Sequence, residues 1–435
     1  MNINPYFHYQ PEDSQQDKDT QVNLNSTLSV FVGNKLWLEK HIVKNIYKKG
    51  ARMLKKTILK IALTFLTWAV ALQAGETKVA GEIWNRYVAN RKGGKTTSSQ
   101  FSFDRGYFTL EPKLSDKIKG RFTLDFFSSD KYNDGAGIKV KYGFLDFAEL
   151  LPIKESNFQV GLIKNYFGIV YDWEYPVIEK SLEDKEKVVA SVDFGAALSG
   201  YLPKGFGEYA LGIYNGEGYT KTQSKVNKNF ASVFNLRLTP VAGITIGGSV
   251  LMDKPGFTGL IRQTTSSTRA ESTFKKVFDT RTAYAGITKL AFGPVEIWGE
   301  YLFNQYDSTT QVKITHSDPT LEDTIRDNVY TYKSSGYSVT PIISLKSLTG
   351  FDGDLVLRYD YWDPNTAVKN YANATVVAGL NYHILRSSSA SPVLTLQLNW
   401  QRKSYVKEEA TIADKSPEDQ LGLQLKWKFS STILK

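Results

Sequence analysis

The residues of this chain that could do chemistry are charged side chains, because the groups of a catalytic or metal site are missing from its sequence. It has four histidines and no cysteine, and neither His316 nor His383 has a partner at the spacing of metal ligands. The phosphate-binding loop, the HExxH zinc motif and the G-x-S-x-G nucleophile turn are all absent from the sequence. We therefore expect no enzyme activity, no metal and no cofactor.

Basic residues instead recur at alternate positions within apolar segments. In residues 121–126, Arg, Thr and Asp alternate with Phe, Leu and Phe. In a strand this alternation puts polar and apolar side chains on opposite faces. If the polar face lines a water-filled passage, its charges attract or repel passing ions. The candidate lining residues are Lys119, Arg121, Lys139, Lys141, Arg237, Arg358, Lys426 and Lys428.

A second set of charges lies in the polar segment 168–189. Its candidate residues are Asp172, Glu174, Glu179, Lys180, Glu183 and Lys185. The lining set is basic, which favours anions, whereas this segment is acidic on balance, which favours cations. For each single residue the alternative is a solvated charge that takes no part in permeation.

The elements that must position these charges are about sixteen segments of alternating polarity. Each is close to the length of about 9–11 residues that a tilted membrane strand needs. The segments centre on Val79–Val88, Phe101–Leu110, Lys119–Phe127, Ile138–Phe147, Phe158–Phe167, Ala190–Tyr201, Tyr209–Tyr214, Phe230–Leu238, Ile244–Leu251, Thr280–Ala291, Val295–Tyr306, Tyr330–Leu345, Leu355–Trp362, Thr375–Leu385, Val393–Tyr405 and Gln420–Phe429.

The two faces of each strand follow from the alternation. We expect apolar residues to face lipid, because a charge on the lipid face at mid-membrane costs roughly 2–4 kcal/mol. On this basis Tyr142 joins Ile138 and Val140 on the outer face, opposite to Lys139 and Lys141. Aromatic residues near strand ends suit the headgroup belts. The belt candidates are Trp84, Tyr87, Tyr166, Phe167, Tyr359–Trp362, Trp427 and Phe429.

The connections between these segments alternate between short turns and long polar loops. Short connections such as 203–205 and 292–294 contain Pro and Gly, which tight turns favour, and the long ones include 91–100, 168–189 and 253–277. A sheet in lipid must pair every backbone group and so must close on itself. We therefore predict an all-β transmembrane antiparallel barrel of about 16 strands, with short periplasmic turns and long extracellular loops. A soluble sandwich gives no reason for this sorting of connections.

The front of the chain predicts export. Lysines at 55, 56 and 60 precede the apolar run 61–72, and Ala69-Val70-Ala71 offers a small-residue cleavage site. Such a run is too short to span a bilayer and is typical of a secretory signal peptide. We expect translation to start at Met53, which makes residues 1–52 a misassigned upstream extension, 53–74 the signal peptide and 75–435 the outer-membrane barrel.

Two parts of the chain resemble known outer-membrane proteins. Leu421–Phe429 is similar to the terminal strand that barrel insertion machinery recognises, except that residues 430–435 follow its final aromatic. The motifs VGLIKNYFG, VDFGAALSGYLP, EYALGIYNGEGYTK and NFASVFNLRLTP, between Val160 and Met252, resemble the Gram-negative porins of the phosphate-selective porin O/P type. This resemblance implies a sixteen-stranded barrel, often trimeric. It also implies that the third outside loop, here about Gly168–Val189, folds inward and narrows the pore.

These observations together predict an outer-membrane porin. It would form a water-filled channel for passive diffusion of small hydrophilic solutes and ions, with a lean toward anions such as phosphate. The alternatives are a non-conducting structural or adhesive barrel and an outer-membrane enzyme. Expected partners are outer-membrane lipid, the insertion machinery through Leu421–Phe429, two further copies of the chain in a homotrimer, and small anions or other hydrophilic solutes. The net charge of +10 is not gathered in one patch, so nucleic acid is not an expected partner.

Overall fold

The fold is described from a computed structural model. The structure describes residues 76–128, 135–219, 229–254, 264–266, 269–315, 324–367, 372–405 and 416–434. The predicted upstream extension and signal peptide, residues 1–74, lie outside the described residues, as does His316.

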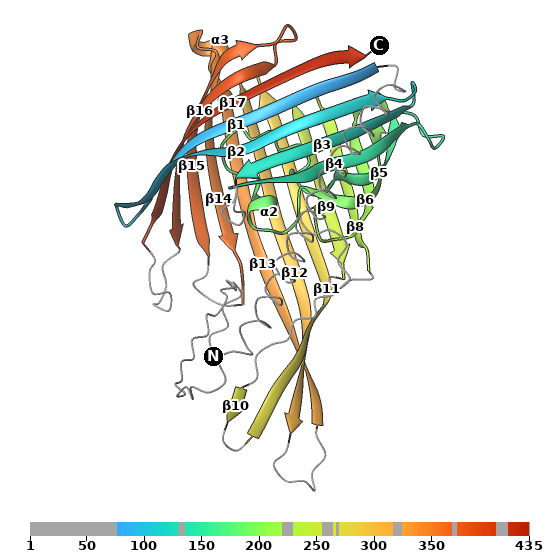
Figure 1. Cartoon of the computed structure of the whole chain (residues 1–435), viewed down its shortest axis with the longest axis vertical. Coiled ribbons are helices and arrows are strands. Elements are labelled where there is room, and N and C mark those ends of the chain that lie inside the picture. Colours follow the sequence, from blue (N-terminus) through green and yellow to red (C-terminus); the bar gives the residue numbers. More distant parts are fainter. Residues whose placement is uncertain are drawn as a thin grey trace, which may run out of the picture. The chain divides into compact units, whose positions relative to one another are not determined.

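The strands form one antiparallel sheet that closes into a barrel (Figure 1). Its closing pair joins β1 to β17, from Thr77 opposite Leu434 to Lys92 opposite Glu418. Sixteen strands make the barrel, and the short β10 pairs with an extension of β11. The strands are β1 (Glu76–Lys92), β2 (Lys95–Lys113), β3 (Ile118–Ser128), β4 (Ala136–Ala148), β5 (Ser156–Lys164), β6 (Val192–Leu202), β7 (Gly207–Tyr214), β8 (Ala231–Val241), β9 (Ile244–Asp253), β10 (Thr264–Ser266), β11 (Arg269–Phe292), β12 (Val295–Thr315), β13 (Thr324–Ser344), β14 (Gly353–Asp363), β15 (Asn373–Arg386), β16 (Pro392–Tyr405) and β17 (Glu418–Leu434).

Each predicted strand segment coincides with a barrel strand, which confirms the predicted fold class. Turns such as 242–243 and 293–294 gather at one end, which we call the short-turn end, and the other is the long-loop end. The predicted loop 91–100 is wrong in detail, because β1 and β2 continue to a tight turn at Gly93-Gly94. Both glycines have positive φ, 55° and 81°, which residues with a side chain rarely adopt.

The helical segments of the described residues are short. They are α2 (Leu182–Lys185), the 3₁₀ turn η1 (Pro203–Gly205) and α3 (Lys346–Thr349). Among the described residues, no helix has the length and apolar character needed to cross a membrane.

The outer and inner faces of the barrel differ in polarity, as the alternation predicts. On β17, Leu421 and Leu423 are exposed on the outer face, whereas Gln424 is fully buried on the inner face. Its amide donates a hydrogen bond of 2.6 Å to Gln397 on β16. Amide and hydroxyl groups therefore pair across the inner wall, while hydrocarbon covers the outside.

One predicted face is wrong, and a β-bulge explains why. Thr123 on β3 pairs with Tyr142, but the next residue, Leu124, pairs with Val140, so Lys141 is an extra residue in β4. The bulge lets Lys141 and Tyr142 both face inward. The Tyr142 ring lies 4.5 Å from the Arg121 guanidinium on the inner wall. The shift of register therefore corrects the assignment of Tyr142 to the lipid face.

Several aromatic residues assigned to the headgroup belts lie inside the barrel instead. Trp84, Phe167 and Trp362 are buried. Trp84 packs edge-on against Tyr175, with ring centroids 4.8 Å apart. Phe429, in contrast, is exposed on the outer face, where a belt residue belongs.

Candidate functional site: loop 3 and the inner wall

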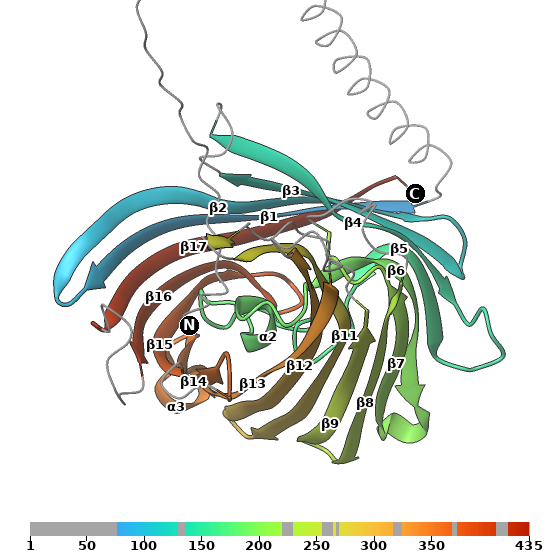
Figure 2. The same cartoon turned by 90° about the horizontal axis from the view of Figure 1, so that it is seen from below.

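The connection between β5 and β6, residues 165–191, folds into the barrel, and we call it loop 3. Figure 2, a view along the barrel, shows its helix α2 inside the ring of strands. Leu182 of α2 is fully buried in an apolar cluster with the wall residues Val233 and Leu302. Burying a side chain of this size contributes roughly 1.5–3 kcal/mol. The third outside connection thus lies inside the barrel, as the family resemblance implied.

Arg237 on β8 holds the beginning of loop 3. Its Nη1 lies 2.7 Å from Asp172 and 3.1 Å from Glu208, and its Nη2 donates to the Gly168 carbonyl at 2.6 Å. The Tyr171 ring covers the guanidinium at 4.4 Å. Lys289 on β11 also contacts Asp172. Arg237 therefore faces inward, as predicted, but loop 3 covers its charge.

Arg358 on β14 plays the same part for the returning half of loop 3. Its Nε lies 2.7 Å from Asp360, its Nη1 donates to the Lys180 carbonyl at 2.5 Å, and Trp173 lies against its guanidinium at 5.0 Å. Lys185 reaches the same Asp360 carboxylate at 3.2 Å. Arg358 and Lys185, both candidates from the sequence, are thus loop-to-wall contacts.

The middle of loop 3 is attached by amide side chains of β15 and β16. Asn381 donates to the Pro176 carbonyl at 2.9 Å, and Gln397 donates to the Tyr175 carbonyl at 3.1 Å. Asn399 accepts the Ile178 amide at 2.8 Å. These neutral contacts fix the middle of loop 3 to one side of the barrel, while Tyr175 also reaches Trp84 on β1.

The wall formed by β2, β4 and β5 carries cations. Lys139 lies 3.8 Å from Asp125, whereas Lys141 donates to the Ser191 hydroxyl at 2.8 Å and lies 4.3 Å from the Tyr219 ring. Arg105 is held by the Tyr107 and Tyr175 hydroxyls at 2.7 and 3.1 Å. Among the described residues, neither Arg105 nor Lys141 forms an ion pair with a carboxylate.

Arg105 was not among the sequence candidates, although the sequence contains a signal for it. The apolar residues Phe101 and Phe103 occupy odd positions, whereas Phe108 and Leu110 occupy even positions, so the alternation changes its phase between them. The structure places the change of phase at Asp104, where the register between β1 and β2 shifts. This second bulge turns Arg105 toward the lumen. A break in alternation was therefore the available clue.

The acidic residues of loop 3 lie within electrostatic reach of this wall. The Asp184 carboxylate attracts the Lys141 ammonium, and the Glu174 carboxylate attracts the Lys164 ammonium. Glu179 acts on the Arg86 guanidinium of β1, which is also paired with Asp104 at 2.9 Å. A basic wall and an acidic loop surface therefore face each other across the barrel interior.

Most of the remaining candidates are paired with neighbouring charges, and Lys426 also donates to the Glu174 carbonyl of loop 3 at 3.2 Å. Lys119 is exposed near the short-turn end, and Arg121 lies 3.7 Å from Glu111. Lys426 and Lys428 both reach Glu82, at 3.4 and 3.8 Å. Lys180 pairs within loop 3 with Asp184 at 3.4 Å. Glu183 lies away from these groups, buried against Glu300 on β12.

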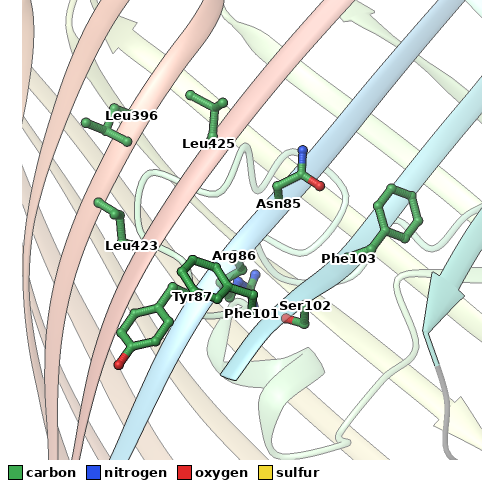
Figure 3. A pocket seen from close by; sticks show the side chains of 9 residues that line it. All are labelled: Asn85, Arg86, Tyr87, Phe101, Ser102, Phe103, Leu396, Leu423 and Leu425. Carbon is green, nitrogen blue, oxygen red and sulfur yellow. The ribbon is translucent and has the colours of Figure 1, made fainter. Parts of the chain in front are cut away.

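A separate groove of about 430 Å³ lies on the outer face, over the seam where β1 meets β17 (Figure 3). Tyr87 pairs with Leu423 and Asn85 with Leu425 there, so these side chains share the lipid-facing side. The groove is therefore distinct from the charged interior. Its lining residues are Asn85, Arg86, Tyr87, Phe101, Ser102, Phe103, Leu396, Leu423 and Leu425.

No protein-family model and no curated protein matches this chain. Among solved structures, it is similar to OmpT of Vibrio cholerae with loop L8 deleted, at a TM-score of 0.51 and 10% identity, covering 81% of this chain and 99% of that one. In-vitro folded OmpT of the same organism gives 0.50 and 12%, with 81% and 98% covered. An anion-selective porin from Comamonas acidovorans gives 0.49 and 12%, with 81% and 99% covered. At these identities the similarity to the two OmpT structures shows the barrel fold alone.

Proposed function

We propose that this protein is an outer-membrane porin, which conducts small hydrophilic solutes and ions by passive diffusion. The observation that carries the proposal is loop 3, which enters a sixteen-stranded barrel and brings acidic side chains opposite a basic wall. A barrel of this strand number encloses a water-filled channel. Charges that face each other across a passage select among permeating ions.

We further propose a preference for anions. Arg105 supports it, because it is held by two tyrosine hydroxyls and has no carboxylate ion-pair partner among the described residues. Arg121 supports it because its side chain is 33% exposed on the inner wall. The carboxylates of loop 3 oppose this preference, but several are engaged: Asp172 with Arg237, and Asp184 with Lys180. Phosphate is one anion such a wall would accept.

The proposal is tested by recording single channels of the purified protein in planar bilayers. We expect conductance steps, and a reversal potential in a potassium chloride gradient that indicates chloride as the more permeant ion. Arg121→Gln, which removes a part-exposed charge from the inner wall, should move the reversal potential toward cation preference. Lys346→Gln, which removes an equal charge from the exposed helix α3, should leave it in place.

Two other outcomes would favour the alternatives. Absence of conductance steps from correctly folded protein would contradict the porin proposal and favour a structural or adhesive barrel. Turnover of lipid or peptide substrates would favour an enzyme. A homotrimer, and insertion through Leu421–Phe429, are further proposals, which cross-linking in native membranes and assembly assays would test.

A further inference from the structure

Two carboxyl groups meet in the barrel interior, where loop 3 touches β12. The Ile169 amide donates to Glu183 Oε1 at 2.8 Å and to Glu300 Oε1 at 3.1 Å. Glu183 and Glu300 are only 0% and 4% exposed. The start of loop 3, its helix α2 and the wall strand β12 are therefore joined at one point.

This geometry requires a proton. Two ionised carboxylates in contact, away from water, repel each other and lose their hydration, so one of them stays protonated. The second oxygens agree with this requirement: Glu183 Oε2 and Glu300 Oε2 are both buried, and neither has a hydrogen-bond donor among the described residues. One carboxyl proton shared by the pair supplies a hydrogen-bond donor between the two groups, which two ionised carboxylates would lack.

We propose that Glu183 and Glu300 share one proton as a latch, which holds loop 3 against β12 and opens when the proton is lost at alkaline pH. The other contacts of loop 3 join cations, amides or apolar groups to the loop, and the lysines among them, Lys141 at Ser191 and Lys426 at the Glu174 carbonyl, titrate by losing an ammonium proton rather than a carboxyl proton. The latch is therefore the contact in this set that depends on a titrating carboxyl proton.

The charges around the latch do not replace its proton. The cation that attracts Glu300 is Arg358 on β14, whose Nε is paired with Asp360 and whose Nη1 is bonded to the Lys180 carbonyl. Its Nη2 is buried and donates no hydrogen bond to the pair. Lys185 is also directed to Asp360, and Glu179 adds a negative charge near Arg358. The Ser249 hydroxyl of β9 accepts the Gly168 amide rather than facing the pair.

The sign of the pH dependence follows from burial. Burial raises the pKa of Glu183 above its usual range, so the folded loop holds its proton more tightly than an open loop would. The stabilisation is therefore fully present below the pKa of an open loop and is lost as pH rises through the raised value. If the protein conducts as proposed, release of loop 3 would also change the passage.

Hydrogen exchange of residues 165–191 tests the latch without relying on conduction. The full chain in lipid nanodiscs would be compared between about pH 7 and about pH 10, after correction for the intrinsic rate of amide exchange. Above the pKa of the pair, we expect exchange in loop 3 to rise about tenfold for each pH unit. Equal protection at both pH values would overturn the proposal.

Substitutions sharpen the same test. Glu300→Gln places an amide donor where the shared proton lies, so loop 3 should stay protected at alkaline pH; Glu183→Gln is a second version should the first not fold. Glu174→Gln removes an exposed carboxylate from the same loop and should keep the pH-dependent rise. An unchanged rise in both latch variants would mean that the pair is only a structural contact.

A tether provides an independent control. The Val177 Cγ1 atom lies 3.3 Å from the position of a Cβ on Gly379, which is within disulfide reach, and the chain has no other cysteine. In Val177→Cys/Gly379→Cys, oxidation should abolish any alkaline change of single-channel conductance, and reduction should restore it. A protein without conductance at every pH would contradict the porin proposal, while the exchange test of the latch would stand.

Discussion

Arg121 and Arg237 show that two inward-facing arginines need not do the same work. Arg121 is part-exposed in the lumen and its nearest carboxylate oxygen, on Glu111, is 3.7 Å away. Arg237 is buried between two carboxylates and a backbone carbonyl. The first is part-exposed to water with one long ion pair, whereas the second is held in several close contacts with loop 3.

We therefore expect different results from replacing the two residues by alanine. Arg121→Ala should reduce anion over cation permeability and leave unfolding unchanged. Arg237→Ala should lower the free energy of unfolding by about 1–3 kcal/mol, because the Gly168 carbonyl loses its donor and Asp172 keeps only Lys289 as its partner. Reversal potentials and urea unfolding in lipid vesicles measure the two effects. A stable Arg237→Ala variant with altered selectivity would instead make it a pore residue.

A second prediction at residue scale concerns the turn between β13 and β14. The Arg386 guanidinium donates to both oxygens of Asp352, at 2.7 to 3.0 Å, and this lowers the pKa of Asp352 to about 2. At pH values above the unfolded-state pKa of about 3.9, the ionised Asp352 stabilises the folded turn. This stabilisation is lost as the pH falls through about 2. Asp352→Asn should therefore loosen this turn at neutral pH and make no difference at the lowest pH. Hydrogen exchange of residues 345–353 would show it, and equal exchange at neutral pH would contradict it.

Sequence reasoning located the charged residues better than it assigned their roles. The alternation alone placed Arg237 and Arg358 on the inner face. It could not show that loop 3 covers them, because that contact joins residues such as Lys180 and Arg358 that are far apart in the chain. The latch was missed for the same reason: Glu300 lies in a regular strand, and only folding brings it to Glu183.

At the scale of strands, the phase of the alternation decides what each side chain meets. The sixteen strands were predictable because each has its own run of alternating residues. The bulges at Asp104 and Lys141 shift that phase by one residue. No residue type marks a bulge in the sequence. Val140, before the bulge, was therefore assigned to the correct face, and Tyr142, after it, to the wrong one.

Backbone contact between β4 and β5 gives a prediction at this scale. Gly161 has φ of 128°, and a Cβ there would lie 2.3 Å from the Gly143 carbonyl oxygen. Gly161→Ala should therefore cost at least about 1–3 kcal/mol of stability, since backbone atoms must move. A Cβ on Gly286 of β11 would have no atom within 4 Å, so Gly286→Ala is the matched control. Similar urea midpoints for the two variants would refute this prediction.

At the scale of the whole molecule, the seam between β1 and β17 decides whether the barrel closes. The Phe429 ring packs directly over Gly81, where a Cβ would lie 2.2 Å from it. The strand continues beyond this aromatic, with Thr432 opposite Lys78 and Leu434 opposite Thr77. The pairs from Gly81–Phe429 to Lys92–Glu418 make up most of the seam.

We predict that Phe429 matters more to assembly than the residues after it. Deleting residues 430–435 should leave assembly into vesicles containing the insertion machinery close to its normal rate. Phe429→Ala should slow it, because the aromatic finish of the strand is lost and Gly81 is left uncovered. The folded fraction is followed by its resistance to heating in detergent. Slower assembly of the shortened chain than of Phe429→Ala would show that recognition lies in the final residues.

The seam also imposes an order of events on the cell that makes this protein. The seam joins Arg86 to Gln424, which are 338 positions apart. Strand β1 is therefore synthesised long before strand β17. Long-range pairing of this kind is slow, and each strand offers an unpaired edge until it forms. Those edges need a chaperone between export and closure, and a shortage of it would yield aggregates rather than partly closed barrels.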